Sequence, residues 1–146
     1  MNPPPRDERV ARAVAIFEGL TRENLAGLAG LYADNAHFRD PFNDVRGHDA
    51  IRRIFDDMFV RLADCRFEFR EVVSDEHGAL LTWDMAFRFR RYRPAAPQTI
   101  HGASHLKFDA AGRIVYHRDY WDAADELYAK LPLIGPVMRY LKRRMA

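Results

Sequence analysis

Hydrophobic residues in the first part of the chain recur with the three- and four-residue spacing of helices. The first such run ends at Gly19 and predicts a helix over residues 7–18, with the apolar positions Val10, Val14 and Phe17. Thr21 can cap a second, short helix, marked by Leu25, Leu28, Leu31 and Tyr32. A third helix is predicted to open at Gly47, with an apolar stripe of Ile51, Ile54, Phe55, Met58, Phe59 and Leu62.

From Arg66 onward, hydrophobic and polar residues alternate as they do along strands. Turn signals divide this half of the chain at residues 75–78, 94–97 and 109–112. We predict four strands, over residues 66–74, 79–92, 98–108 and 113–122, and one short earlier strand, 36–39, which Pro41 closes. Helices followed by strands are typical of an α+β domain, here three N-terminal helices packed on one face of a curved, mostly antiparallel sheet.

The size and composition of the chain fit one globular domain. It has 146 residues, of which 48% are hydrophobic and 12% aromatic, enough to build a sizeable core. The prolines at positions 3–5 predict a disordered leader over residues 1–6. The domain itself is expected over residues 7–131, and a basic C-terminal helix within 132–146 is expected to begin near Val137.

Positive charge is concentrated at the C-terminus. Four of the 23 basic residues are Arg139, Lys142, Arg143 and Arg144, and the remaining basic residues against 21 acidic ones leave the rest of the chain at −2. No nucleic-acid partner is therefore predicted. Because Val137, Met138 and Leu141 lie opposite these cations, the helix is expected to cap the mouth of the domain or a dimer groove; contact with an anionic membrane is the alternative.

Several classes of protein are disfavoured. The single cysteine, Cys65, cannot form an internal disulfide, which fits a reducing compartment. No apolar run approaches the length of a membrane span and residues 1–5 lack the pattern of a signal peptide, so a cytoplasmic protein without stable membrane insertion is expected. Neither a metal site nor a nucleotide cofactor is predicted, since His37, His101 and His105 lack metal-ligand spacing and no phosphate-binding loop occurs.

The most informative chemistry lies on the last predicted strand. Alternation places His117, Asp119 and Trp121 on one face, and Arg118, Tyr120 and Asp122 on the other. An imidazole, a carboxylate and an indole on one face are a plausible lining for a pocket that performs acid and base chemistry. Against this stands a simpler interpretation, in which Asp119 is solvated or paired with an arginine.

Two further carboxylates are candidates. Asp40 stands at a strand-to-loop junction before Pro41, where it is either a pocket residue or a turn former that accepts hydrogen bonds from nearby backbone amides. Asp84 alternates with the apolar residues Trp83, Met85, Phe87 and Phe89. If those residues point inward, Asp84 is a surface group; if they point outward, Asp84 lies in the pocket and a second copy should cover the apolar face.

Several short sequence segments, together with the order of the predicted elements, resemble the nuclear transport factor 2-like superfamily, which includes ketosteroid isomerases, SnoaL-like polyketide cyclases and limonene epoxide hydrolases. The resemblance spans about residues 8–131. It rests on the segments Leu31–Ala36, Asp40–Pro41, Arg46–Ile51, Phe108–Ile114 and Arg118–Tyr120. It implies a cone-shaped fold around a pocket for a hydrophobic small molecule, and a homodimer.

The resemblance also implies roles for individual residues. Asp40 matches the proton-moving carboxylate of the isomerases, whereas the tyrosine and aspartate of their oxyanion hole fall at Phe17 and Ser104. Comparison with the epoxide hydrolases places their two pocket aspartates at Asp84 and Asp119. Their arginine falls at Thr82, and their water-positioning tyrosine and asparagine fall at Phe38 and Asp40. SnoaL-like cyclases require less, namely an acid or base in a dry aromatic cone.

The leading hypothesis is a cofactor-independent enzyme of isomerase or cyclase type that acts on a hydrophobic cyclic molecule such as a steroid or polyketide. Asp40 is the expected general base, with Asp119 and Asp84 as further catalytic candidates. The expected substrate-binding residues are Phe17, Phe38, Phe42, Ser104, His117 and Trp121. His117 is expected to orient Asp119 or shuttle a proton, unless it is a structural histidine. The alternative function is a non-catalytic module that binds a lipid-like ligand or stabilises a dimer.

Overall fold

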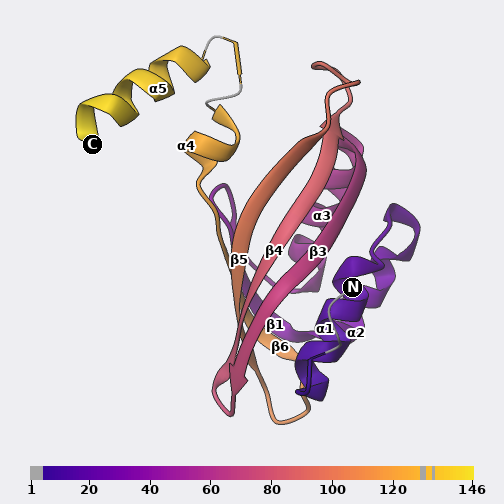
Figure 1. Cartoon of the computed structure of the whole chain (residues 1–146). Helices are drawn as coiled ribbons and strands as arrows, with labels where there is room; N and C mark the ends of the chain where they lie inside the picture. The colour runs from indigo at the N-terminus through magenta and orange to yellow at the C-terminus, as the bar shows by residue number, and fades with distance from the viewer. Residues whose placement is uncertain (1–4, 129–130, 133) are drawn as a thin grey trace.

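The computed structural model describes residues 5–128, 131–132 and 134–146 (Figure 1). Its helices are α1 (Glu8–Glu18), the 3-10 helix η1 (Arg22–Gly27), α2 (Leu28–Leu31), α3 (His48–Arg61), α4 (Ala123–Glu126) and α5 (Ile134–Met145). Its strands are β1 (Tyr32–Arg39), β2 (Asp44–Arg46), β3 (Leu62–Asp75), β4 (Gly78–Phe89), β5 (Gln98–Phe108) and β6 (Ile114–Tyr120).

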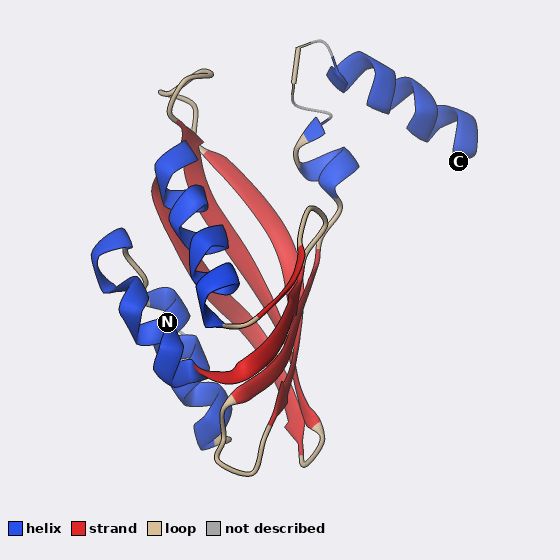
Figure 2. Ribbon diagram, turned by 180° about the vertical axis from the view of Figure 1, so that it is seen from behind, coloured by secondary structure: helices blue, strands red, loops and turns tan. Residues whose placement is uncertain are grey.

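The strands form one curved sheet in the order β2-β1-β6-β5-β4-β3. Only the pairing of β1 with β6 is parallel among the described strands, and the other neighbours are antiparallel. Helices α1, α2 and α3 cover one face of this sheet (Figure 2), and none of these three helices lies over the opposite face, which is turned to the viewer in Figure 1. The predicted α+β architecture, with N-terminal helices on a mostly antiparallel sheet and a further C-terminal helix, is confirmed.

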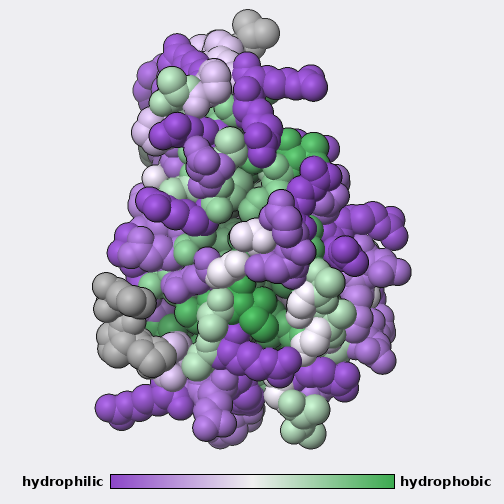
Figure 3. Space-filling model, turned by 90° about the vertical axis from the view of Figure 1, so that its right-hand side faces the viewer, coloured by the Kyte–Doolittle hydropathy of each residue, from purple (hydrophilic) through white to green (hydrophobic). Residues whose placement is uncertain are grey.

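The helix-covered face of the sheet holds the core. The largest buried cluster joins α1, η1, α2 and α3 to the sheet through residues that include Val10, Leu31, Ile51 and Ile114. A second cluster, toward the hairpin between β4 and β5, contains Trp83, Met85, Phe87 and Ile100. The apolar side chains of β4 therefore point inward, and Asp84 lies on the opposite, outer face of the sheet. In the side view of Figure 3, hydrophilic side chains cover most of the surface.

Several boundaries differ from those that the hydrophobic pattern predicts. β1 begins at Tyr32 rather than residue 36, because pairing with β6 extends it as far as the Tyr32–Ile114 pair. β2 and α4 were not predicted. α5 begins at Ile134 and takes Pro136 into its first turn, where a missing backbone N–H costs no hydrogen bond. Most of the leader predicted over residues 1–6 lies outside the described residues. Within the described part, no helix has the length and apolar character needed to cross a membrane.

Candidate functional site

A chain of polar side chains crosses the inner face of the sheet and converges on Asp119. Trp83 Nε1 donates to Ser104 Oγ at 2.8 Å, and Ser104 Oγ donates to Asp119 Oδ1 at 2.5 Å. From the other side, the Tyr32 hydroxyl lies 2.6 Å from His117 Nδ1, and His117 Nε2 lies 2.7 Å from the same Oδ1. Five side chains from four strands thus form one network.

Burial keeps Tyr32 protonated, and the Asp119 carboxylate orients the proton of His117. Tyr32 is 1% exposed, and burial, reinforced by the negative charge of Asp119, holds its pKa well above the ordinary value of 10. The phenol therefore keeps its proton. Because a carboxylate only accepts hydrogen bonds, the contact with Asp119 places a proton on His117 Nε2. In the tautomer with its proton on Nε2, Nδ1 accepts the hydrogen bond that the Tyr32 hydroxyl donates. Both branches of the network deliver donors to one oxygen of the carboxylate.

Strand register explains why these residues meet. Ser104 on β5 pairs with Asp119 on β6, and Phe38 on β1 pairs with His117. His117 and Asp119 are two residues apart on β6, so their side chains share one face as predicted. Gly102 makes room for the Trp83 ring: a Cβ at this position would lie 2.4 Å from an indole carbon. The indole can therefore lie over the neighbouring strand and reach Ser104.

Aromatic rings enclose the His117 side of the network. The rings of Phe17 and Phe38 meet the imidazole edge-on at centroid distances of 5.5 and 4.8 Å. A cavity of about 20 Å³ remains beside the network, lined by Phe17, Phe55, Phe67, Phe69, Trp83, Ser104, His117 and Asp119. This volume suffices for one water molecule among several polar partners.

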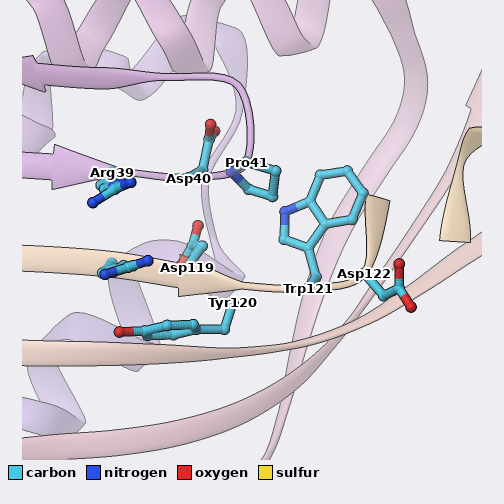
Figure 4. A pocket seen from close by; sticks show the side chains of 8 residues that line it. Arg39, Asp40, Pro41, Asp119, Tyr120, Trp121 and Asp122 are labelled. Carbon is cyan, nitrogen blue, oxygen red and sulfur yellow. The ribbon is translucent and has the colours of Figure 1, made fainter. Parts of the chain in front are cut away.

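A larger pocket, of about 520 Å³, opens where β1 and β6 end (Figure 4). It is lined by Arg39, Asp40, Pro41, Arg118, Asp119, Tyr120, Trp121 and Asp122. Figure 4 shows Asp40 directly after β1 and Asp119 on the adjoining strand β6, with Trp121 and Asp122 following β6. Asp119 lines both this outer pocket and the inner cavity. A ligand in the outer pocket would therefore meet the carboxylate on which the buried network converges.

Asp40 lies at the pocket but is engaged in a turn. Its Oδ1 accepts hydrogen bonds from the backbone N–H groups of Phe42, at 2.8 Å, and Asn43, at 2.7 Å. The Asn43 side-chain amide adds contacts of 3.0 and 3.1 Å to the two carboxylate oxygens. This is the arrangement expected of a turn-forming aspartate, the alternative raised by the Asp40–Pro41 pair.

Asp84 is not brought into this cluster. On the outer face its carboxylate hydrogen-bonds His101 Nδ1 and binds Arg70 at 2.8 Å. The hydrogen bond with His101 lowers the pKa of Asp84, and the hydrogen bond from Arg70 adds to the effect. The epoxide-hydrolase comparison, which implied a paired Asp84 and Asp119 in one pocket, therefore does not fit the structure: the sheet separates the two side chains.

The predicted substrate-binding residues divide between the two cavities. Phe17, Ser104 and His117 line the inner cavity, and Phe38 packs against His117. Trp121 lines the outer pocket. Phe42 is 52% exposed and meets Trp121 edge-on at 5.5 Å, so it forms part of the rim rather than an inner wall.

Sequence reasoning missed two members of the network. Tyr32 was interpreted as part of the second helix, and Trp83 only as an apolar strand residue. The sequence offers only a general signal for Trp83, that a buried indole N–H needs an acceptor. Its pairing with Gly102 is a register that the sequence does not specify. Across residues 5–128, 131–132 and 134–146, the His, Cys, Asp and Glu side chains form no group of three or more that could hold a metal ion.

Comparisons with known proteins agree with this fold. A family model described as a SnoaL-like domain matches residues 13–117, more than half of the chain. A sequence comparison with curated proteins gives no match.

Among solved structures, a protein of ketosteroid isomerase-like fold from Catenulispora acidiphila, in complex with trimethylamine, superposes with a TM-score of 0.71. The two sequences are 15% identical, over 82% of this chain and 89% of that one. An LEH-like epoxide hydrolase from M. tuberculosis superposes with a TM-score of 0.67; the sequences are 21% identical, over 94% of this chain and 99% of that one. A steroid delta-isomerase from Pseudomonas aeruginosa superposes with a TM-score of 0.61; the sequences are 23% identical, over 98% of each chain. At these identities the likeness concerns the fold.

Proposed function

The chain belongs to the family of SnoaL-like domains, and from the geometry of its site we propose that it is an acid–base enzyme acting on a hydrophobic small molecule. The substrate enters the outer pocket at the ends of β1 and β6, and Asp119 moves a proton to or from it. The reaction is an isomerisation or cyclisation that needs no metal or nucleotide. Asp40, the general base favoured by sequence alone, becomes a structural residue of the turn that shapes the pocket.

The observation that carries this proposal is the convergence of the network on Asp119 Oδ1. Ser104 and His117 both donate to that oxygen, and neither donates to Oδ2. The two donors fix the orientation of the carboxylate. Because the Asp119 side chain is 19% exposed and reaches the outer pocket, Oδ2 is left as the acceptor that faces a substrate. A fixed carboxylate at the edge of an apolar interior is well suited to proton transfer from carbon.

The lining of the outer pocket supplies a complementary donor. Trp121 lines it on the side of Asp119, whereas Arg39 and Arg118 project from the opposite face of the sheet, where Arg39 binds Asp44 and Arg118 lies over the ring of Tyr120. The Trp121 indole N–H can hydrogen-bond a carbonyl oxygen that gains negative charge when Asp119 removes a neighbouring proton. In an isomerisation the same carboxylate returns the proton to a different carbon. In a cyclisation the carbanion attacks a second carbonyl of the same substrate, and the alkoxide formed there takes the proton back from Asp119.

The test is incorporation of solvent deuterium into a panel of cyclic ketones, followed by mass spectrometry. The protein should catalyse exchange into at least one of them, and Asp119→Asn should abolish it while His101→Gln, on the outer face, keeps it. Saturable binding of these ketones without exchange would reject the catalytic proposal.

One observation favours the second candidate function, a non-catalytic binding module. The interior beside the network is filled by phenylalanine rings, so that only about 20 Å³ remains there. On this alternative, Asp119 serves the network as a structural acceptor and a lipid-like ligand occupies the outer pocket alone. Tight ligand binding that Asp119→Asn leaves intact would support it.

Pairing of two copies also belongs to the proposal. The outer face of the sheet is not covered by α1, α2 or α3 (Figure 1), and it exposes Leu80, Tyr120 and Val73. The apolar side chains of β4 do not contribute to this dimer surface, because Trp83, Met85 and Phe87 are buried inside the protein. Sedimentation equilibrium should give twice the chain mass, and Leu80→Asp should shift the equilibrium to the monomer.

A further inference from the structure

Helix α5 exposes a continuous apolar stripe. Ile134, Val137, Leu141 and Met145 follow one another at intervals of three or four residues, so they lie on one face of the helix. Their exposed fractions are 43%, 52%, 45% and 87%. Tyr140, at one side of the stripe, is 55% exposed. Side chains of this kind are normally covered when they share one face of a helix.

Every charged side chain in this helix is positive. Its cations are Arg139, Lys142, Arg143 and Arg144, and no acidic residue occurs from Ile134 to the end of the sequence. At about 100° per residue, Lys142 and Arg144 fall on opposite edges of the apolar stripe. Lys142 also binds Asp125 of α4 at 2.7 Å, which ties the helix to the body of the protein.

The placement of α5 leaves the stripe accessible. Figures 1 and 2 show the helix extending away from the sheet, beyond α4 and on the far side of the sheet from α1 and α2. Pairing of two such helices from two copies would bring eight positive charges together, because each contributes four. Like charges at close range oppose such pairing. The charge pattern instead matches a negatively charged surface.

We propose that α5 docks the protein on an anionic lipid surface. The apolar stripe enters the boundary between headgroups and acyl chains, while Arg144 extends along one edge to the phosphates and Lys142, at the other edge, exchanges Asp125 for a phosphate. Arg139 and Arg143, on the polar side, add long-range attraction to the same surface. A single helix of this length gives reversible binding that depends on both the apolar and the electrostatic contributions. The proposal is independent of the chemistry at Asp119.

The experiment is co-sedimentation of the full chain with phospholipid vesicles. Binding is expected to vesicles that contain about 30 mol % phosphatidylglycerol and not to pure phosphatidylcholine. Raising the salt concentration from roughly 0.05 to 0.5 M should release the protein, because the Debye length then becomes short. Neutralising Lys142, Arg143 and Arg144 to Gln should lower the partition coefficient about fivefold for each charge, or roughly a hundredfold together.

A matched control removes the same charge elsewhere. Arg52→Gln, Arg53→Gln and Arg91→Gln together change the net charge equally, at exposed positions outside α5, and should lower binding far less. Leu141→Asp tests the apolar stripe and should abolish binding while the far-UV circular dichroism and melting temperature stay unchanged. The proposal is overturned if binding does not distinguish the two lipids, if the control loses as much as the α5 variant, or if Leu141→Asp instead dissociates a dimer in sedimentation equilibrium.

Discussion

Two histidine–aspartate pairs lie on opposite faces of the same sheet, and their surroundings differ sharply. In the inner pair the side chains of His117 and Asp119 are 4% and 19% exposed. In the outer pair those of His101 and Asp84 are 67% and 23% exposed, and Arg70 adds a salt bridge. The residue types are the same in both pairs. The neighbours decide what each carboxylate can do.

In the outer pair, solvent and Arg70 can satisfy the hydrogen-bonding groups, so loss of the hydrogen bond between His101 and Asp84 should lower the free energy of unfolding only slightly. The inner pair has no such alternative partners. Its hydrogen bonds to Ser104 and Tyr32 lie among aromatic rings, where a donor that loses its acceptor stays unsatisfied. The same enclosure that makes Asp119 important for stability also holds it in one orientation, as proton transfer requires.

The largest stability difference is expected between Asp119→Ala and Asp84→Ala. The first leaves the buried donors of Ser104 and His117 without an acceptor and should lower the free energy of unfolding by about 2–4 kcal/mol. The second should change it by less than about 1 kcal/mol, because Arg70 and His101 can turn to water. Urea unfolding of both variants measures the difference. Equal losses would mean that the inner network does not stabilise the fold.

Replacement of Gly102 tests the path from Trp83 to Ser104. The Cβ of Gly102→Ala would lie 2.4 Å from the indole, so overpacking should lower the free energy of unfolding by about 1–3 kcal/mol. Gly27→Ala is the matched control, since no atom lies within 4 Å of the added Cβ and its backbone is helical. That change should be neutral or stabilise by about 0.4–1 kcal/mol. Thermal melting distinguishes the two, and two similar melting curves would contradict the close fit of the ring.

Tyr32→Phe should have a smaller effect, whose pH dependence identifies its origin. It removes one hydrogen bond to His117 and should lower the free energy of unfolding by about 1–2 kcal/mol near neutral pH. Because burial raises the pKa of Tyr32, the folded state holds this proton more tightly than the unfolded chain. This contribution is complete below the ordinary pKa of 10 and declines above it. The difference between wild type and variant should therefore shrink at alkaline pH; a constant difference would contradict a buried neutral phenol.

The smallest expected effect is the pH dependence of the outer pair. The hydrogen bond with His101 lowers the pKa of Asp84 below the ordinary value of 3.8, so the folded state favours the ionised carboxylate. The resulting stabilisation is present above that ordinary value and is lost as pH falls through the lower, folded-state pKa. Urea unfolding of wild type and Asp84→Asn should give curves that differ slightly at pH 6 and converge in acid. If the difference in free energy of unfolding between wild type and Asp84→Asn instead grew in acid, it would contradict a lowered pKa of Asp84 in the folded state.

Much of the fold and part of the site could be predicted from the sequence. The change from helical spacing to alternation gave the α+β class, and alternation alone placed His117 and Asp119 on one face. Ser104 was reached only through the family resemblance. Its hydrogen bond to Asp119 depends on the register of β5 with β6, which separated segments of sequence do not specify.

The remaining parts of the site depended on tertiary contacts. Tyr32 follows Leu31 in an apolar run that suits a helix, and only its pairing with β6 makes it a strand residue. The face of the sheet on which Asp84 lies could not be assigned, because alternation defines two faces of a strand without indicating which face the helices cover. Asp40 had two interpretations of similar weight, and the hydrogen bonds from Phe42 and Asn43 favour the turn.

The central claim, that Asp119 of the inner pair is the proton carrier, is tested most directly by three matched substitutions in one assay. Asp119→Asn, Asp84→Asn and Asp40→Asn each replace a carboxylate by an amide of the same shape, and their rates of deuterium exchange can be compared on a ketone that the wild-type protein exchanges. Asp119→Asn should lose about 10²–10⁴-fold in rate, while Asp84→Asn retains the wild-type rate and Asp40→Asn stays within about tenfold of it. A folded Asp119→Asn protein with an undiminished rate, or a loss confined to Asp40→Asn, would contradict the account.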